Sequence, residues 1–350
     1  MQERAIKYPL KFRPVFRPAI WGGGRLVAFM DCGTDQLSGI PCGEAIGECW
    51  GISAVPGYES VVLNGNLKGM SLSEVTSSYG VELMGEENSK KYGADFPLLV
   101  KFIDAAKDLS VQVHPNDGMA AERHGCSGKT EMWYVIDAAE GASLLAGFSS
   151  EVVKQEFEKL SGEEIMGLLQ KFYIKEGDMF YLPAGTVHSI GAGAFIAEIQ
   201  QSSDITYRIY DYDRRDASGR TRELHTQQAL DAIDFSISGD ACKISNIEAD
   251  KLSDNIWERA VGNVKSEYFT TSMLELRSDG GKARSYDFSY AHLKSFVILT
   301  CVGGSMSVVY GNESVMGVKQ GDVVLLPADL ESVSFKLAPY SECRFLETHI

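Results

Sequence analysis

An internal repeat constrains the fold of this 350-residue chain more than any other feature. The segment at 175–184 (KEGDMFYLPA) matches the segment at 319–328 (KQGDVVLLPA) at most positions. Upstream of each copy lies a run rich in β-branched and aromatic residues, which are typical of strands. Self-similarity of this kind indicates that one supersecondary unit occurs twice. We therefore predict a mainly β chain that contains two copies of one antiparallel barrel.

The predicted organisation has a catalytic, metal-binding domain over residues 1–235, a linker region over 236–254 and a C-terminal domain over 255–350. Residues 149–172 carry apolar side chains at helical spacing, which predicts a small helical insertion between strands of the first domain.

The two copies of the repeat differ where chemistry would be placed. Glu131 of the first copy corresponds to Ser295 of the second, and His188 corresponds to Ser332. The C-terminal copy is therefore expected to be degenerate, with a structural role.

Composition excludes several classes of function. The formal charge of −15 opposes nonspecific binding to nucleic acid or to an anionic membrane. No run approaches the roughly 18 apolar residues of a membrane span. The seven cysteines include no Cys-x-x-Cys pair, which favours free thiols in a reducing compartment. We expect a cytoplasmic protein whose partner is a small molecule; the oligomeric state is left open.

A glycine-rich segment near the start does not predict a nucleotide site. Residues 21–26 (WGGGRL) lack the Gly-Lys-Ser/Thr ending of a phosphate-binding loop.

Three segments carry candidate metal ligands. In the extended segment 109–114, alternation places Ser110, Gln112 and His114 on one face. A second segment begins at Glu131, and a third ends at His188. Imidazole nitrogens and carboxylate oxygens from different strands can together bind a divalent cation.

We predict His114, Glu131 and His188 as ligands, with Gln112 as a weaker amide ligand. The alternative is that all four are hydrogen-bonded barrel residues. The remaining histidines are expected at the surface or at helix caps: His124, His225, His292 and His349.

The third segment has the pattern Gly-Asp-x4-Pro-x-Gly-x2-His, which resembles a motif of the cupin superfamily, whose members are double-sheet jelly rolls that hold a metal. A closer resemblance is to type I mannose-6-phosphate isomerase in its short bacterial form. Four segments carry it, in the same order: 109–115, 128–133, 183–190 and 198–208. This resemblance implies a mainly β fold of two cupin-type jelly-roll barrels with a small helical insertion.

The resemblance also implies roles for individual residues. One Zn²⁺ per chain would be held by Gln112, His114, Glu131 and His188. Arg208 would project into the active site. Lys101, Ser110 and Lys129 match positions associated with the substrate phosphate, and Glu198 matches a proposed proton shuttle.

Two departures from longer members of the family are visible. A short helical insertion replaces the large helical domain of those members. The loop between His188 and Glu198 is also one residue longer, which leaves open the direction in which the Glu198 side chain points. Strand parity still places Glu198 and Gln200 on one face.

The expected reaction is the metal-dependent interconversion of mannose 6-phosphate and fructose 6-phosphate through a cis-enediol. We expect Glu198 to be the catalytic base, with Lys129 as its rival, and Arg208 to orient the sugar and stabilise charge.

Arg208, Lys101 and Lys129 could also have no role in catalysis. The alternative for Arg208 is a salt bridge with Asp204 or Asp211, and the alternative for the two lysines is a solvated position on the protein surface. The arginines at 214, 215, 220 and 222 alternate with acidic residues and are predicted to form a solvated turn.

Two other functions stay open. One is a different metal cupin enzyme, such as an oxygenase or another sugar-phosphate isomerase, although the amide, carboxylate and imidazole set suits a redox-inert zinc better. The other is a sugar-binding or regulatory barrel without turnover, in which Lys129, Glu198 and Arg208 would be unnecessary. Chelation separates them, because it would abolish isomerisation but leave simple sugar affinity partly intact.

Overall fold

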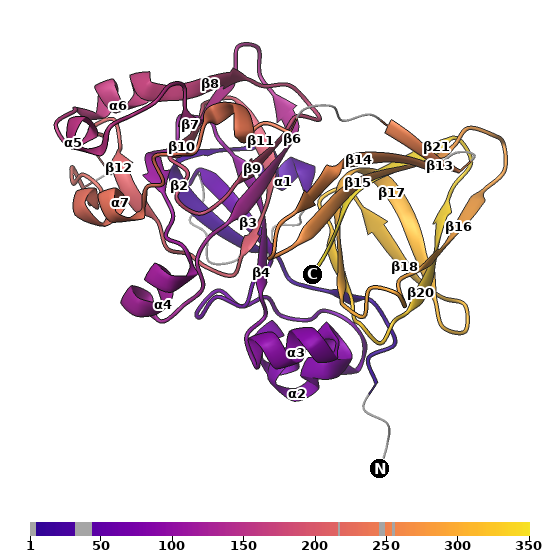
Figure 1. Ribbon diagram of the computed structural model, residues 1–350. Helices are drawn as coiled ribbons and strands as arrows, with labels where there is room; N and C mark the ends of the chain where they lie inside the picture. Colours follow the sequence, from indigo (N-terminus) through magenta and orange to yellow (C-terminus); the bar gives the residue numbers. More distant parts are fainter. Residues whose placement is uncertain (1–4, 32–43, 216–217, 245–248, 254–255) are drawn as a thin grey trace.

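The structure is a computed structural model that describes residues 5–31, 44–215, 218–244, 249–253 and 256–350. For 249–265 only the backbone is described. The described residues form a mainly β protein with three antiparallel sheets, of six, five and ten strands (Figure 1).

The six-stranded sheet positions half of the predicted site. Its order is β2-β3-β4-β11-β6-β9. The strands are β2 (Val15–Gly23), β3 (Ile46–Ile52), β4 (Leu98–Asp104), β11 (Ala194–Gln201), β6 (Glu131–Ala138) and β9 (Met179–Leu182). Every residue of the central strands β4 and β11 is buried, so the polar side chains that they carry lie in the interior.

The five-stranded sheet supplies the other half. Its order is β12-β5-β10-β7-β8. The strands are β12 (Tyr207–Tyr210), β5 (Val111–Val113), β10 (His188–Ile190), β7 (Ser143–Phe148) and β8 (Leu169–Tyr173). Side chains from both sheets, including Ile103, Trp133, Leu144 and Ile190, form one hydrophobic cluster, so the two sheets pack against each other.

The ten-stranded sheet contains the second copy of the repeat. Its main path is β1-β19-β17-β21-β15-β14-β13, and β16, β18 and β20 pair outside that path. The strands are β1 (Leu10–Lys11), β13 (Ala249–Ser253), β14 (Ile256–Lys265), β15 (Thr270–Ser278), β16 (Arg284–Ser289), β17 (Val297–Tyr310), β18 (Ser314–Lys319), β19 (Val323–Leu326), β20 (Ser332–Leu337) and β21 (Ser341–His349). The N-terminal strand β1 therefore belongs to the C-terminal sheet.

The sheets differ from the closed barrels that the repeat predicts. In the described part of the chain, the strand orders are open paths, and none returns to its first strand. β13 and the short 3-10 helix Gly239–Ala241 fall within the predicted linker region.

Helices lie at the edges of the sheets. They are α1 (Arg25–Phe29), α2 (Leu72–Met84), α3 (Glu86–Tyr92), α4 (Asp117–His124), α5 (Lys154–Phe157), α6 (Gly162–Leu168), α7 (Thr226–Ala232) and the 3-10 helix Gly65–Leu67. A capping box formed by Ser71 and Glu74 begins α2. Two short helices, α5 and α6, occupy the predicted insertion, and with α7 they lie at the side of the molecule away from the ten-stranded sheet (Figure 1).

Among the described helices, none has the length and apolar character needed to cross a membrane.

Candidate active site

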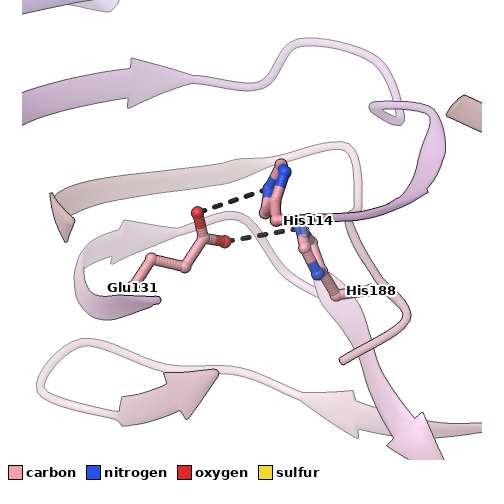
Figure 2. A group of neighbouring side chains, drawn as sticks. All are labelled: His114, Glu131 and His188. Carbon is pink, nitrogen blue, oxygen red and sulfur yellow. Dashed lines mark ion pairs between the residues drawn. The ribbon is translucent and has the colours of Figure 1, made fainter. Parts of the chain in front are cut away.

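The two small sheets bring three predicted ligands together in the protein interior. His114 follows β5, His188 begins β10 and Glu131 begins β6. One nitrogen or oxygen atom from each lies within 4.8 Å of the others. His114 Nε2 is 3.5 Å from Glu131 Oε2, and His188 Nε2 is 3.4 Å from Glu131 Oε1 (Figure 2). All three side chains are buried.

Backbone carbonyls orient both imidazole rings. His114 Nδ1 lies 2.9 Å from the carbonyl oxygen of Ile205, and His188 Nδ1 lies 2.9 Å from that of Thr186. Because a carbonyl only accepts, each Nδ1 carries the proton and each Nε2 lone pair faces Glu131. Burial lowers the pKa of His188 to about 4 and lowers the pKa of His114 well below its usual value. Both rings are therefore neutral at physiological pH, as metal coordination requires.

The environment of the Glu131 carboxylate indicates whether this cluster suits a metal ion. The side chain is fully buried; Lys129 Nζ lies 3.2 Å from Oε2, and Oε1 accepts no hydrogen bond from any described residue. Burial raises its pKa above the usual value. A buried carboxylate oxygen without a hydrogen-bond donor is costly, so Oε1, which faces His188, favours a bound cation even though Lys129 lies beside Oε2. Two neutral imidazoles and this carboxylate form a donor set that fits a divalent metal ion.

Gln112 is part of the cluster, but its amide is turned. Gln112 pairs with His188 and with Arg208 across β5, β10 and β12. Its Nε2 lies 3.2 Å from His188 Nε2, while its Oε1 accepts a 3.3 Å hydrogen bond from the hydroxyl of Ser110. Coordination through the amide oxygen would require the amide to rotate by half a turn.

Lys129 belongs to the same cluster. Its Nζ lies 3.1 Å from His114 Nε2 and 3.2 Å from Glu131 Oε2. The side chain is only 4% exposed, so the solvated alternative is wrong for this lysine.

A row of polar side chains crosses the six-stranded sheet beside the cluster. Trp50, Lys101, Glu198 and Trp133 are paired in register on β3, β4, β11 and β6. Lys101 Nζ lies 3.0 Å from Glu198 Oε1, and the Trp133 indole donates a 3.0 Å hydrogen bond to Glu198 Oε2. Lys101 is buried as well, so its solvated alternative is also wrong.

The charges in this row are fixed by their partners. Burial alone would raise the pKa of Glu198, but Lys101, Lys129 and the indole of Trp133 outweigh it and hold the pKa below its usual range. Burial would lower the pKa of Lys101, but Glu198 and Glu48 outweigh it and raise the pKa. Glu198 is therefore a carboxylate, and Lys101 an ammonium, at neutral pH.

Arg208 does not form the predicted alternative salt bridge. Its guanidinium donates a 2.9 Å hydrogen bond to the backbone oxygen of Glu223, and its buried Nε has no hydrogen-bond partner in the described part of the chain. Asp204 lies 3.8 Å from Arg17, and Asp211 is occupied by other arginines. Because Arg208 pairs directly with Gln112, it lies on the same face of the sheet as the metal-ligand candidates.

The arginine-rich turn departs in part from the prediction of a solvated segment: Arg215 and Arg220 are exposed as predicted, but the other two arginines bind a buried carboxylate. Arg214 and Arg222 both bind Asp211, which is 4% exposed, and Arg222 Nε is 2.7 Å from Asp211 Oδ2. Burial raises the pKa of Asp211, but hydrogen bonds from Arg222 and Arg214 outweigh it and lower the pKa below its usual value.

The other histidines lie outside the cluster. His124 is exposed and lies 2.8 Å from the hydroxyl of Tyr207, and His225 occupies the N-cap position of α7. His292 is exposed, and His349 ends β21.

Two tryptophans were not predicted as site residues. Trp133 donates to Glu198, and the indole of Trp50 donates a 2.6 Å hydrogen bond to Glu48. Strand parity could have found Trp133, because it lies two positions after Glu131 and therefore shares its face.

This geometry can be compared with known proteins. Residues 10–145 match the family model described as phosphomannose isomerase type I, catalytic domain. The chain is 37% identical over 338 residues to mannose-6-phosphate isomerase ManA of Bacillus subtilis, covering 96% of this chain and 97% of that protein. The chain belongs to the type I phosphomannose isomerase family.

Other relatives agree with this membership. Mannose-6-phosphate isomerase of Streptococcus mutans is 37% identical, over 93% of this chain and 95% of the relative. The crystal structure of mannose 6-phosphate isomerase from Bacillus subtilis superposes with a TM-score of 0.81 at 34% identity, covering 98% of this chain and 99% of that one. The apo enzyme of Salmonella typhimurium, at 15% identity and a TM-score of 0.72, shares the fold.

Proposed function

We propose that this protein is a metal-dependent aldose–ketose isomerase that interconverts mannose 6-phosphate and fructose 6-phosphate through a cis-enediol. The observation that carries the proposal is the buried Glu131 carboxylate, which faces two neutral imidazoles and whose Oε1 accepts no hydrogen bond from the described residues. The names of the relatives agree with this reaction.

We propose one Zn²⁺ per chain at this cluster. His114 Nε2, His188 Nε2 and Glu131 would hold it, with Gln112 completing the set through its amide oxygen. When bound, such an ion supplies positive charge that stabilises an oxyanion on the sugar. The redox-inert choice suits a reaction in which hydrogen moves within one molecule and nothing is oxidised overall.

Glu198 is the proposed base. Its carboxylate takes the proton from C2, and the electron pair of the broken C–H bond forms the C1=C2 double bond of the enediol. In the same step the π pair of the C1=O bond moves onto O1, which takes up the proton that the O2 hydroxyl gives up. As the C2=O bond then forms, the C1=C2 pair takes the proton back from Glu198 at C1, which gives the ketose. The ammonium of Lys101 and the indole of Trp133 orient the carboxylate, because each contacts a different oxygen of Glu198.

Lys129 is the alternative proton carrier, because it is the cation next to both His114 and Glu131. Arg208 is proposed to orient the sugar and to stabilise the enediolate with its permanent charge.

Substrate-binding roles are proposed for Ser110, Lys101 and Lys129. Each is buried beside the metal-ligand candidates or beside Glu198. Two buried lysines provide the positive charge that a sugar phosphate requires in a protein whose overall charge is negative.

We also propose that the sheets are cupin-type jelly rolls and that the chain divides as predicted. The catalytic domain would cover 1–235, the linker region 236–254 and the degenerate domain 255–350. A cytoplasmic location is proposed from the free thiols of the described cysteines.

The test is a coupled assay of mannose 6-phosphate isomerisation on three samples: protein as purified, protein after chelation, and protein after zinc is restored. We expect activity to disappear on chelation and to return with zinc, with bound metal measured in each sample by mass spectrometry. Metal-loaded protein that binds mannose 6-phosphate in a calorimeter but turns over none of it would instead establish a non-catalytic sugar-binding protein.

A further inference from the structure

A cavity whose lining includes none of the metal-ligand candidates lies between the helical insertion and the outer edge of the five-stranded sheet. Its volume is about 420 Å³, and its walls come from α5, α6, β12 and α7, which lie together in Figure 1. A cavity of this size is within the range of small-molecule sites. The lining residues are Phe157, Glu158, Leu160, Ser161, Gly162, Glu163, Ile165, Ile209, Tyr210, Asp213, Leu224, Thr226, Ala229 and Leu230.

The cavity has an apolar floor and an acidic rim. Phe157, Ile165 and Leu230 are each less than a tenth exposed and form the floor. Three carboxylates stand at the rim, all exposed to solvent: Glu158, Glu163 and Asp213. No lysine or arginine is among the described residues that line the cavity. Its charge is therefore complementary to a cation.

Tyr210 brings an aromatic ring to the acidic side of the rim. A Cβ atom on Gly162 would lie 2.1 Å from this ring, so α6 begins directly against it. Burial is the largest cause that raises the pKa of the Tyr210 hydroxyl. The negative charges of Glu163 and Asp213 raise it further, which places both carboxylates near the phenol. An aromatic ring flanked by carboxylates attracts an organic ammonium group through electrostatic and cation–π interactions.

The N-terminal end of α6, which borders the cavity, does not make the cavity suitable for an anion instead of a cation. Ser161 Oγ accepts from the backbone of Glu164 at 3.4 Å, and Glu164 Oε2 accepts from the backbone of Ser161 at 2.8 Å. This capping box already satisfies donors of the first turn, and Glu163 and Glu164 add negative charge there.

We propose that this cavity binds a small amphipathic cation, an alkylammonium or arylammonium ion. Its apolar body would lie on Phe157, Ile165 and Leu230, and its ammonium group would face Tyr210, Glu163 and Asp213. The occupant would contact Ile209 and Tyr210, which follow Arg208 on β12. The site is independent of the isomerase proposal and would exist even if that proposal failed.

The test uses three probes of similar shape and different charge on the full-length protein: 2-phenylethylammonium, neutral 2-phenylethanol and the 3-phenylpropanoate anion. Isothermal titration calorimetry should give saturable binding for the cation, with a dissociation constant of about 1 mM or tighter. The neutral probe should bind at least several-fold more weakly, and the anion more weakly still.

Variants locate the site. Glu163→Gln combined with Asp213→Asn should weaken cation binding by about fivefold or more, because both substitutions remove rim charge while keeping side-chain size. Glu156→Gln is the matched control: it changes an exposed glutamate of α5 that does not line the cavity. All substituted residues are exposed, so unchanged thermal unfolding should confirm that the variants fold.

Three results would overturn the proposal: no saturable binding of 2-phenylethylammonium, equal binding of the neutral probe, or a loss of affinity in the control variant equal to that in the rim variant.

Discussion

The two copies of the repeat have the same turn but different interiors. Gly177 and Gly321 both have a φ of +86°, in the left-handed region that glycine favours. In each turn the following aspartate caps the chain: Asp178 Oδ2 accepts from the backbone of Lys175 at 3.1 Å, and Asp322 Oδ2 accepts from that of Lys319 at 2.9 Å. The repeated residues therefore preserve backbone geometry.

The side chains that would carry chemistry differ. The register corrects one predicted correspondence: Val297 lies opposite Leu326 as Glu131 lies opposite Leu182, so Val297, and not Ser295, takes the place of Glu131. Ser332, which corresponds to His188, is exposed. The interior of the second copy is filled by an apolar cluster that includes Phe335 and Phe345. The comparison shows that one β framework can either bury a polar site or be filled completely by hydrocarbon.

The largest expected effect comes from converting the first copy to the residues of the second. We expect Glu131→Val and His188→Ser each to reduce kcat/KM for mannose 6-phosphate by about a thousandfold or more, because each removes a proposed metal ligand. Bound zinc, measured in the same samples, should fall below one ion per chain. Ser332→Ala in the second copy is the control; a comparable loss there would end the distinction between the two copies.

The second prediction concerns the apolar interior of the second copy. Phe335 is fully buried, with its ring centroid 4.8 Å from that of Phe288 and 5.4 Å from that of Phe345. Phe335→Leu should lower the free energy of unfolding by about 1–2 kcal/mol, because the smaller side chain leaves these contacts unfilled. Urea denaturation measures this loss. Isomerase activity per folded molecule should stay unchanged, and a fall in kcat would show that this copy contributes to catalysis.

A smaller effect is expected from one hydrogen bond of the polar row. Trp133→Phe removes the donor to Glu198 but keeps an aromatic ring in the sheet. We expect kcat to fall by about tenfold with little change in KM, because the carboxylate loses one of two groups that orient it. Trp50→Phe is the matched control, since that indole donates to Glu48 instead. Equal losses in both variants would indicate a general packing defect.

The smallest expected effect concerns pH and the buried Asp211. Its folded-state pKa is lowered by Arg222 and Arg214 against the effect of burial, so its ion pairs stabilise the fold above the unfolded-state pKa of about 4 and this contribution is lost as pH falls further. Asp211→Asn should therefore make the free energy of unfolding less dependent on pH below about pH 4, by less than about 1 kcal/mol. Chemical denaturation at several pH values measures the slope, and an unchanged slope would contradict this assignment.

Some of the site could be predicted from the sequence because it depends on local rules. Alternation along one strand placed Gln112 and His114 on one face, and the repeat showed which copy retained Glu131 and His188. The structure brings these four residues together as the patterns indicate.

Other features depend on strand register, which local patterns do not specify. Lys101, Glu198 and Trp133 meet because three strands distant in sequence pair at those residues. The two arginines that bind Asp211 were predicted to be solvated, because alternating charges in a turn do not reveal that one carboxylate is buried. Closure of the sheets into barrels is likewise a property of hydrogen bonding between strands, which a repeat does not specify, and the described strand orders are open paths.

The pairing of β1 with β19 has a consequence for the order in which the chain acquires its structure. Leu10 and Lys11 find their strand partners at Leu325 and Val324, and Lys11 Nζ is 2.6 Å from Asp322 Oδ2, 311 positions later. During synthesis Leu10 and Lys11 must therefore wait, without their strand partners, until residues 324 and 325 have left the ribosome. Contacts between such distant residues form slowly, because a long loop must close first. Strand β1 is thus made long before the strand that fixes it in place.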